Sequence, residues 1–285
     1  MKDEIWLRLR RSRTIRRMQA MPGMGSLIAK LSWSLVPYYR PRVVRVRGGL
    51  GEGLLLRINP RWGLPLWEGT YEQAVQDVLA KLLGPGKVFY DVGGGIGFFS
   101  LIAARLGATA ICFEPDKTNA SFVETHMALN ALESKVELVR KAVFSRTGCV
   151  AFGNSSPERG YGNGYVQEVH VDRSARWVTG EDLSERTPKS ALCTDVPCVK
   201  LDDFVAGRAL PDVIKIDVEG AESDILKGAG KLLNQARPHL ICELHDAANS
   251  EFVQAQLRSK GYGLTWLETG DCFTKTVLAS PTSIC

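Results

Sequence analysis

Short apolar runs alternate with amphipathic stretches along most of the chain. Short apolar runs are typical of buried strands, whereas apolar residues spaced three or four positions apart indicate helices. Strands are predicted at 88–92, 109–113, 136–139, 213–216, 240–244, 263–267 and 273–278. Helices are predicted at 70–83, 98–106, 119–132, 221–233 and 250–259. Because this alternation produces right-handed crossovers, the strands are expected to form a parallel sheet with helices on both faces.

The two ends of the chain depart from this pattern. A short turn around 269–271 joins the last two strands, which are therefore expected to pair as an antiparallel hairpin. Strand-like pieces at 43–46 and 54–58 predict a smaller hairpin ahead of the main sheet. The predicted fold is α/β, with a doubly wound, mostly parallel seven-stranded sheet in a domain spanning 69–285, after an N-terminal extension spanning 1–68.

An insert at about 150–197 interrupts the alternation. Its middle, 154–165, is rich in Gly, Asn, Ser and Pro, and compact folds rarely carry such long irregular connections without a functional reason. We interpret it as a substrate lid or specificity insert, with a tolerated surface insertion as the alternative. The flanking pieces 149–152 and 196–200 are predicted to form an extra pair of strands at its base.

The net charge of +5 is unevenly distributed. Residues 1–50 hold 12 Lys and Arg against Asp3 and Glu4, a net +10, which leaves −5 for the rest. This basic arm can lie on an anionic membrane surface or contact a phosphate-rich partner, and a solvated basic terminus is the alternative. Arginines scattered through its first apolar stretch, 5–18, argue against a secretory signal, and the later stretch 26–39 is too short and too interrupted to span a bilayer. We expect a cytoplasmic protein with peripheral membrane contact as an option; the oligomeric state is left open.

Cysteine usage agrees with a reducing compartment. The seven cysteines are scattered, without CxxC pairs or nearby histidines. Neither a disulfide framework nor a zinc site is therefore predicted.

A glycine-rich turn follows the strand 88–92 and opens a helix, where doubly wound sheets bind nucleotide-like cofactors. The turn reads Asp91-Val-Gly93-Gly94-Gly95-Ile-Gly97. In the dinucleotide fingerprint a third small residue packs the helix on the strand, and here Phe98 takes that place. A bulky aromatic side chain there argues against a nicotinamide or flavin cofactor.

Two acidic residues indicate a different ligand. Asp91 precedes the turn, and a carboxylate there repels a pyrophosphate but attracts an ammonium group. Glu114 ends the next strand, 23 positions later, where a carboxylate can accept both ribose hydroxyls. S-adenosyl-L-methionine carries an ammonium, a sulfonium and a ribose but no phosphate, so it is the predicted cofactor.

Several segments resemble the FkbM family of S-adenosylmethionine-dependent methyltransferases, over roughly residues 69–245. The resemblance rests on the segments 88–100, 113–116, 141–143, 201–204 and 214–222. It implies a class I methyltransferase sheet and O-methylation of a small molecule, a sugar, or a glycan or lipid-linked group. The chain departs from the family pattern at Gly94-Gly95, where Ala-Asn is usual, and in its long insert.

The resemblance also implies which residues hold the cofactor. Asp91 and the glycines would surround its methionine part, Glu114 its ribose, and the third strand end its adenine ring. The complete predicted set is Tyr71, Glu72, Asp91, Gly93, Gly94, Gly95, Gly97, Phe98, Glu114, Pro115, Asp116, Asn119, Ala142, Val143 and Asp217.

Candidate catalytic residues lie at the ends of the fourth and fifth strands. Methyl transfer to an alcohol is an in-line displacement that requires alignment and removal of a proton. His245 is the first choice as base because its ordinary pKa is near neutrality, and a structural histidine is the alternative. Asp217, Glu243 and Lys215 complete the set. Lys215 could instead form a structural ion pair with Glu219 or Glu243. Asp217, Glu219 and Glu243 could hold a divalent cation, although no metal is predicted.

Two other functions are weaker alternatives. Methylation of amino groups on nucleic-acid bases usually comes with Asn/Asp-Pro-Pro-aromatic after the fourth strand, whereas this chain has Asp217-Val-Glu-Gly220. A nucleic-acid acceptor is therefore disfavoured, although the basic arm keeps a phosphate-rich acceptor open. The charged run 215–222 argues against a non-catalytic scaffold. The expected partner is a small-molecule, sugar or lipid-linked acceptor.

Overall fold

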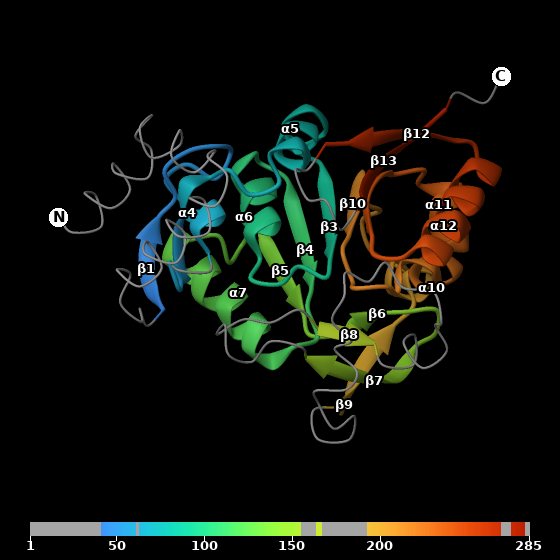
Figure 1. Cartoon of the computed structure of the whole chain (residues 1–285), viewed down its shortest axis with the longest axis horizontal. Coiled ribbons are helices and arrows are strands. Elements are labelled where there is room, and N and C mark those ends of the chain that lie inside the picture. The colour runs from blue at the N-terminus through green and yellow to red at the C-terminus, as the bar shows by residue number, and fades with distance from the viewer. Residues whose placement is uncertain (1–40, 61–62, 155–163, 167–192, 269–274, 283–285) are drawn as a thin grey trace, which may run out of the picture.

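A computed structural model describes residues 41–60, 63–154, 164–166, 193–268 and 275–282. Its centre is a seven-stranded sheet with the strand order β12-β13-β11-β10-β3-β4-β5 (Figure 1). The strands are β3 (Val88–Val92), β4 (Thr109–Phe113), β5 (Val136–Val139), β10 (Val213–Ile216), β11 (His239–Leu244), β12 (Tyr262–Leu267) and β13 (Lys275–Pro281).

The strand order creates a switch point between β3 and β10. From β3 the chain winds outward through β4 and β5, and from β10 it winds the other way through β11, all in parallel. β13 pairs antiparallel with both β11 and β12, so the predicted fold class and the predicted C-terminal hairpin are confirmed. Ligands of such sheets bind outside the carboxyl ends of the strands at the switch point.

Helices cover both faces of the sheet because successive strand residues point to opposite sides. Phe89 packs with α5, α6 and α7, and its neighbour Tyr90 packs with α9 to α12. Figure 1 shows these two groups of helices on either side of the sheet. The bounds are α5 (Gln73–Leu82), α6 (Phe98–Arg105), α7 (Lys117–Asn130), α9 (Leu201–Phe204), α10 (Glu222–Lys227), α11 (Gly230–Gln235) and α12 (Ala247–Ser259).

The predicted N-terminal hairpin is present and packs on α7. Its strands are β1 (Arg42–Arg45) and β2 (Leu55–Ile58), followed by the short helix α4 (Leu64–Glu68). Asn130 pairs with both the N–H and the carbonyl of Leu55, and His126 accepts the N–H of Arg57. Leu56 and Ile58 are fully buried in the cluster that also contains α6, and such burial contributes about 1.5–3 kcal/mol per side chain.

A second sheet stands at the carboxyl end of β5, below the main sheet in Figure 1. It has the order β6-β9-β7-β8, formed by β6 (Ala142–Val143), β7 (Gly148–Asn154), β8 (Gly164–Val166) and β9 (Cys193–Val199). β7 pairs antiparallel with β9, which confirms the predicted pair of strands at the base of the insert. Most of the insert lies outside the described residues, as do the basic arm up to residue 40 and the turn at 269–271.

Helix bounds differ from the predicted ones where the backbone angles or a capping side chain determine where a helix begins or ends. α5 begins at Gln73 rather than at 70, because Glu72 has a left-handed φ of 41°. The predicted helix 221–233 is two helices, because the backbone leaves the helical range at Ala229, which has φ −119° and ψ 18°. α7 begins two residues early because Asp116 caps it. In the described ranges no helix is both long and apolar enough to cross a membrane.

Candidate active site

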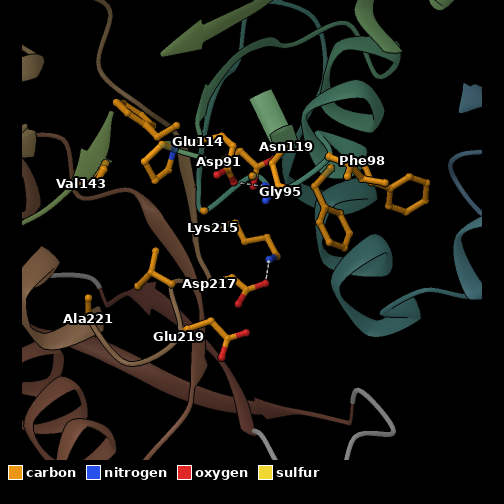
Figure 2. A pocket seen from close by; sticks show the side chains of 18 of the residues that line it. Asp91, Gly95, Phe98, Glu114, Asn119, Val143, Lys215, Asp217, Glu219 and Ala221 are labelled. Atoms are coloured by element: carbon orange, nitrogen blue, oxygen red, sulfur yellow. Dashed lines mark hydrogen bonds and ion pairs between the residues drawn. The ribbon is translucent and has the colours of Figure 1, made fainter. Parts of the chain in front are cut away.

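A cavity of about 230 Å³ opens at the switch point, between the carboxyl ends of the parallel strands and the small sheet. Figure 2 shows Glu114 and Asn119 on one side of Lys215, and Asp217 and Glu219 on the other. The lining residues are Pro65, Leu66, Tyr71, Asp91, Gly93, Gly94, Gly95, Ile96, Phe98, Phe99, Phe113, Glu114, Pro115, Asn119, Lys141, Ala142, Val143, Phe152, Lys215, Asp217, Val218, Glu219 and Ala221.

The glycine turn forms one wall of the cavity. The N–H groups of Gly93 and Gly94 both donate to the Phe113 carbonyl, which fixes the turn against β4. Gly93 has a φ of 79°, and a Cβ there would lie 1.8 Å from the Asp217 carbonyl oxygen. A Cβ at Gly94 would lie 2.3 Å from the Cys112 sulfur, whereas one at Gly95 would meet nothing within 4 Å. Gly93 and Gly94 are therefore required by packing, and Gly95 leaves space beside the cavity.

Glu114 links the glycine turn after β3 to the turn after β4. Its Oε2 accepts the N–H of Gly95 and its Oε1 accepts the N–H of Asp116, each at 2.8 Å. The side chain is buried, and burial raises its pKa to about 8 against the lowering effect of these two hydrogen bonds. Each carboxylate oxygen has a second lone pair, so Glu114 can accept further hydrogen bonds from a ligand in the cavity.

Asp91 lies at the bottom of the cavity with one oxygen unsatisfied. Its Oδ2 accepts the hydroxyl of Ser100 at 2.7 Å, while its Oδ1 is buried and has no hydrogen-bond partner among the described residues. Burial raises the pKa of Asp91, and the nearby Lys215 ammonium opposes that rise. A buried carboxylate oxygen without a donor costs free energy unless a cationic or hydrogen-bonding ligand supplies one.

Lys215 is a buried cation beside Asp91, its partner in the β10–β3 register. Its Nζ is 2.8 Å from Asp217 Oδ2 and 5.0 Å from the centre of the Phe99 ring. Burial disfavours the charge, but the surrounding carboxylates, Asp217 foremost, raise the pKa of Lys215, and Lys215 in turn lowers that of Asp217 despite its burial. The predicted ion pair at Lys215 is therefore with Asp217, rather than with Glu219 or Glu243.

Tyr71 and Glu72 approach the same end of the site from the segment before α5. Tyr71 lines the cavity and packs against the Phe98 and Phe99 rings, at 6.1 and 5.8 Å between centroids. Glu72 Oε2 is buried without a hydrogen-bond partner among the described residues, and burial raises the Glu72 pKa. Its backbone conformation, left-handed in a non-glycine residue, costs about 1 kcal/mol or more and is frequent at functional sites.

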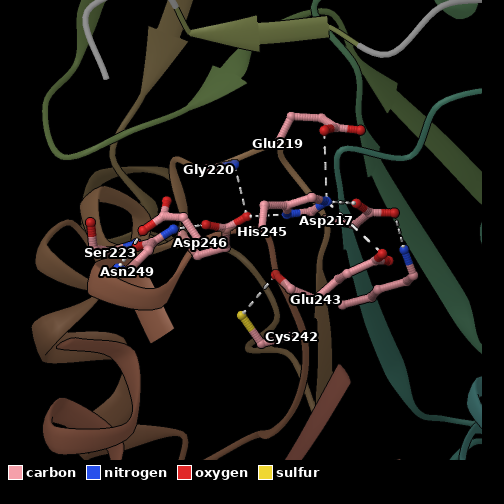
Figure 3. A network of polar contacts seen from close by, with 11 residues as sticks. Asp217, Glu219, Gly220, Ser223, Cys242, Glu243, His245, Asp246 and Asn249 are labelled. Carbon is pink, nitrogen blue, oxygen red and sulfur yellow. Dashed lines mark hydrogen bonds and ion pairs between the residues drawn. The ribbon is translucent and has the colours of Figure 1, made fainter. Parts of the chain in front are cut away.

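His245 lies in a cluster of four carboxylates (Figure 3). Its Nδ1 is 2.7 Å from Glu222 Oε1, and its Nε2 lies 3.6 to 3.9 Å from oxygens of Asp217, Glu219 and Glu243. Burial lowers the pKa of His245, but these carboxylates, Glu222 foremost, outweigh burial and raise it to about 10. His245 is therefore an imidazolium at neutral pH, which argues against the predicted role of base because it already carries the proton.

Glu243, rather than His245, has the near-neutral pKa that was expected of a catalytic base. Burial and the neighbouring Asp217 carboxylate raise the pKa of Glu243 to about 7. Ligand atoms of Asp217, Glu243 and His245 lie within 4.8 Å of one another, with His245 in place of the Glu219 named from the sequence. His245 would have to lose its Nε2 proton before this group could hold a cation.

The structure brings most of the predicted cofactor residues together, and a few lie elsewhere. Gly97, Asp116 and Glu72 are not in the cavity lining: Gly97 packs against Val123, where a Cβ would be tight at 3.2 Å, and Asp116 caps α7. Glu243 and His245 are also outside the cavity lining, and both lie close to Asp217. Lining residues outside the predicted cofactor and catalytic sets are Pro65, Leu66, Ile96, Phe99, Phe113, Lys141, Phe152, Val218, Glu219 and Ala221.

Phe152 is the most informative of these, because it comes from the small sheet rather than from the main one. The strand that carries it was predicted, but nothing in the alternation of apolar and polar residues shows that this strand folds back over the strand ends. It is buried in the cluster that also contains Ala142 and Ala221.

This sheet order, with a glycine turn after the first strand and an acid ending the second, defines a class I methyltransferase. Residues 91–264 match the sequence profile of the methyltransferase FkbM domain. That match covers more than half of the chain, and the chain belongs to the FkbM methyltransferase family.

Relatives agree with this assignment at low identity. The chain is 28% identical over 196 residues to the 2-O-methyltransferase NoeI of Sinorhizobium fredii, covering 66% of this chain and 77% of the relative. It is 28% identical over 200 residues to the 31-O-demethyl-FK506 methyltransferase FkbM of Streptomyces tacrolimicus, covering 63% and 74%.

Two further similarities cover about half of the protein compared. The ribosomal protein L11 methyltransferase of Carboxydothermus hydrogenoformans is 26% identical over 163 residues, covering 55% of this chain and 48% of the relative. A crystal structure of methyltransferase FkbM from Methylobacillus flagellatus superposes with a TM-score of 0.48 at 15% identity, covering 73% of this chain and 53% of that one.

Proposed function

We propose that this chain is an S-adenosylmethionine-dependent O-methyltransferase that acts on a hydroxyl of a sugar, a glycan or lipid-linked group, or another small metabolite. The observation that carries the proposal is the pair of acids at adjacent strand ends: Glu114 braces the glycine turn with lone pairs to spare, and Asp91 has a buried oxygen without a donor. Both line one cavity.

The cavity's chemistry fits this cofactor in three respects. Glu114 can accept the two ribose hydroxyls, as carboxylates do in bidentate hydrogen bonds. The unsatisfied Asp91 oxygen attracts a cation, and Gly95 leaves open space where any side chain would project. Ala142 and Val143 offer an apolar edge at the end of β5 for an adenine ring. When bound, S-adenosylmethionine supplies a methyl group on a positively charged sulfur.

The charged side chains near Lys215 suit binding of the methionine part of S-adenosylmethionine. Lys215 can pair with the carboxylate of an amino acid, while Asp91 can pair with its ammonium. Tyr71 and Phe99 shield these contacts from water, which strengthens them. The protein's own residues thereby bind the methyl donor, orient it and exclude solvent.

Two relatives support a hydroxyl as the acceptor. Their names describe a 2-O-methyltransferase and a 31-O-demethyl-FK506 methyltransferase. The acidic side chains of Asp217 and Glu219 at the cavity edge suit an acceptor with several hydroxyls, because ionised carboxylates accept hydrogen bonds from them.

An acceptor screen with methyl-labelled cofactor tests the proposal. Purified protein is incubated with free sugars, sugar nucleotides, glycolipid extracts and total RNA, and labelled products are separated and counted. We expect label in a hydroxyl-bearing, RNA-free fraction, and at a cofactor concentration near the wild-type Kd we expect much less label for the Glu114→Ala variant.

The same screen separates the alternatives. Label in RNA would replace the proposed acceptor with a phosphate-rich one. Cofactor binding without label in any fraction would favour a non-catalytic scaffold, and absence of binding would reject both the cofactor and the reaction.

A further inference from the structure

The N-terminal hairpin holds two walls of the cofactor cavity without lining it. None of the lining residues comes from β1, from β2 or from the turn between them, 42–58. Figure 1 shows β1 on the same side of the molecule as α4, α6 and α7. Residues 91–264 match the FkbM domain, so the hairpin lies ahead of the matched stretch. Two fully buried side chains, His126 on α7 and Gln76 on α5, connect it to the cavity walls.

His126 connects the hairpin to the glycine turn. Its Nε2 accepts the Arg57 N–H of β2 at 2.9 Å, and its Nδ1 lies 2.8 Å from the Ile96 carbonyl oxygen. Ile96 stands between Gly95 and Gly97 in the turn and lines the cavity. Because His126 is fully buried, water does not compete for either of its nitrogens.

The hydrogen bonds of His126 determine its tautomer. A backbone N–H can only donate and a carbonyl oxygen can only accept, so Nε2 must keep a lone pair for Arg57 and Nδ1 must carry hydrogen for Ile96. The Arg57 carbonyl oxygen is further from Nε2, at 3.3 Å. Burial lowers the pKa of His126, and the Arg57 charge adds to this effect, against the backbone contacts that raise it. The imidazole is therefore neutral at neutral pH.

The glycine turn has little conformational preference of its own around Ile96. Gly95 and Gly97 on either side have φ values of 56° and 83°, and glycine moves readily between such conformations and ordinary ones. The Gly95 N–H donates to Glu114 Oε2, so a rotation at Ile96 would also displace the carboxylate proposed to bind the ribose. A fixed Ile96 carbonyl therefore stabilises the orientation of Glu114.

Gln76 connects the hairpin to the wall that carries Tyr71. Its Oε1 accepts the Leu50 N–H of the hairpin turn at 2.8 Å, and its Nε2 donates to the carbonyl oxygens of Tyr71 and Gly69, at 2.7 and 3.1 Å. The two backbones are in close contact here, because a Cβ at Gly69 would lie 1.8 Å from the Gly48 carbonyl oxygen. The backbone of Tyr71 is thereby fixed where Tyr71 lines the cavity.

We infer that the hairpin preorganises the cofactor cavity through these two side chains: His126 positions the glycine turn, and Gln76 positions the Tyr71 segment. The inference rests on the proposed function, because it concerns the binding of S-adenosylmethionine. Neither residue lines the cavity, so both act through the backbone that they hold. Preorganisation raises affinity because these segments do not have to become ordered on binding.

Long-range proton–nitrogen NMR spectra of the full-length protein test the geometry at His126 without any ligand. The chain has four histidines, and the His126→Asn variant identifies the His126 signals by their loss. At pH 7 we expect a neutral ring with hydrogen on Nδ1 and a lone pair on Nε2. Hydrogen on Nε2 would overturn the inference, because the bond from Arg57 could not then form.

Two substitutions of His126 separate its two hydrogen bonds. In Asn the side-chain nitrogen stands near the position of Nδ1 and can donate to Ile96, whereas in Gln the side-chain oxygen reaches the position of Nε2 and can accept from Arg57. Each variant loses one bond, so we expect similar losses of stability in urea. Calorimetry with S-adenosylhomocysteine should give a Kd within about twofold of the wild type for His126→Asn and about 5- to 20-fold weaker for His126→Gln.

Gln76→Met tests the second connection, because Met has a similar shape but cannot hold the Tyr71 and Gly69 carbonyls. We expect S-adenosylhomocysteine to bind about 5- to 20-fold more weakly. A Gln76 that served stability alone would lower the urea midpoint and leave the Kd unchanged. His239→Gln is the control, because His239 pairs with Ser280 at the amino end of β11, and it should bind as the wild type does.

Equal affinities of His126→Asn and His126→Gln, or an unchanged Kd in Gln76→Met, would refute the inference, since the two residues would then affect stability alone. If His126→Gln does not fold, by circular dichroism, the wild-type tautomer and the His126→Asn affinity decide, and weak binding by His126→Asn would count against the role. If the wild type does not bind S-adenosylhomocysteine, the proposed function fails, while the tautomer still decides whether the hairpin holds the glycine turn.

Discussion

Replacement of Glu114 by Ala separates the two tasks that the structure gives to this carboxyl group. In the unliganded protein it accepts the Gly95 and Asp116 N–H groups. In the complex it would also accept the ribose hydroxyls. The substitution removes all of these bonds, and a typical hydrogen bond contributes about 0.5–1.5 kcal/mol net, so the two bonds to the ribose correspond to about 1–3 kcal/mol.

The loss of stability should be small compared with the loss of affinity. Burial raises the Glu114 pKa to about 8, so keeping this carboxylate ionised is costly for the unliganded fold. Removing the buried carboxyl group relieves this cost, which offsets part of the unfolding free energy lost with the two hydrogen bonds. Cofactor binding has no such compensation, and we expect about 1–3 kcal/mol of lost affinity, or roughly 5- to 150-fold in Kd.

Titration calorimetry with S-adenosylhomocysteine, combined with urea unfolding, measures both quantities. Glu137→Gln is the matched control, because Glu137 is an exposed acid on the neighbouring strand, paired with Arg208. The control should bind as the wild type does. Unchanged affinity in Glu114→Ala would refute the assignment of Glu114 to the ribose.

Three further perturbations follow from the same contacts. Gly94→Ala should destabilise the protein by about 1–3 kcal/mol in urea unfolding, because the new Cβ meets the Cys112 sulfur, and adding Cys112→Ala should restore most of that stability. If the losses of the two single variants simply add in the double variant, this contact is not the cause. Affinity for S-adenosylhomocysteine should rise as pH increases from 6 to 8, by up to about tenfold per pH unit, because Glu114 has a pKa of about 8 in the unliganded protein and the ligand binds its ionised form. A calorimetric affinity that does not change with pH, or the same slope in Glu114→Gln, would argue against this role of Glu114. Lys215→Met should cost about 3–5 kcal/mol of unfolding free energy, because Asp217 loses its buried partner, and a variant as stable as the wild type would show that the pair is not needed.

The sequence predicted the central strands well because most of their residues are buried on one face or the other of the sheet and are therefore apolar. β3, β4, β5 and β10 have the predicted bounds. Helix starts were predicted less accurately, because they depend on single side chains and backbone angles. Asp116 extends α7 by capping it, and the left-handed Glu72 delays α5.

Most of the cofactor site could be predicted from the residues at the strand ends. Asp91 and Glu114 were expected at adjacent carboxyl ends, and the parallel register of β3 and β4 brings them to one cavity. Contacts between distant segments could not be predicted in this way. Phe152 reaches the cavity only because β7 pairs with β9, and the protonation of His245 depends on Glu222, 23 positions earlier and on another element.

The central claim is that the cavity beside Asp91 and Glu114 binds a cation-bearing nucleoside and not a dinucleotide. Calorimetric titration of the wild-type protein with S-adenosylhomocysteine and, separately, with NAD tests it directly. The account predicts saturable binding of one S-adenosylhomocysteine per chain and no heat with NAD. Binding of NAD, or no binding of S-adenosylhomocysteine, would contradict it.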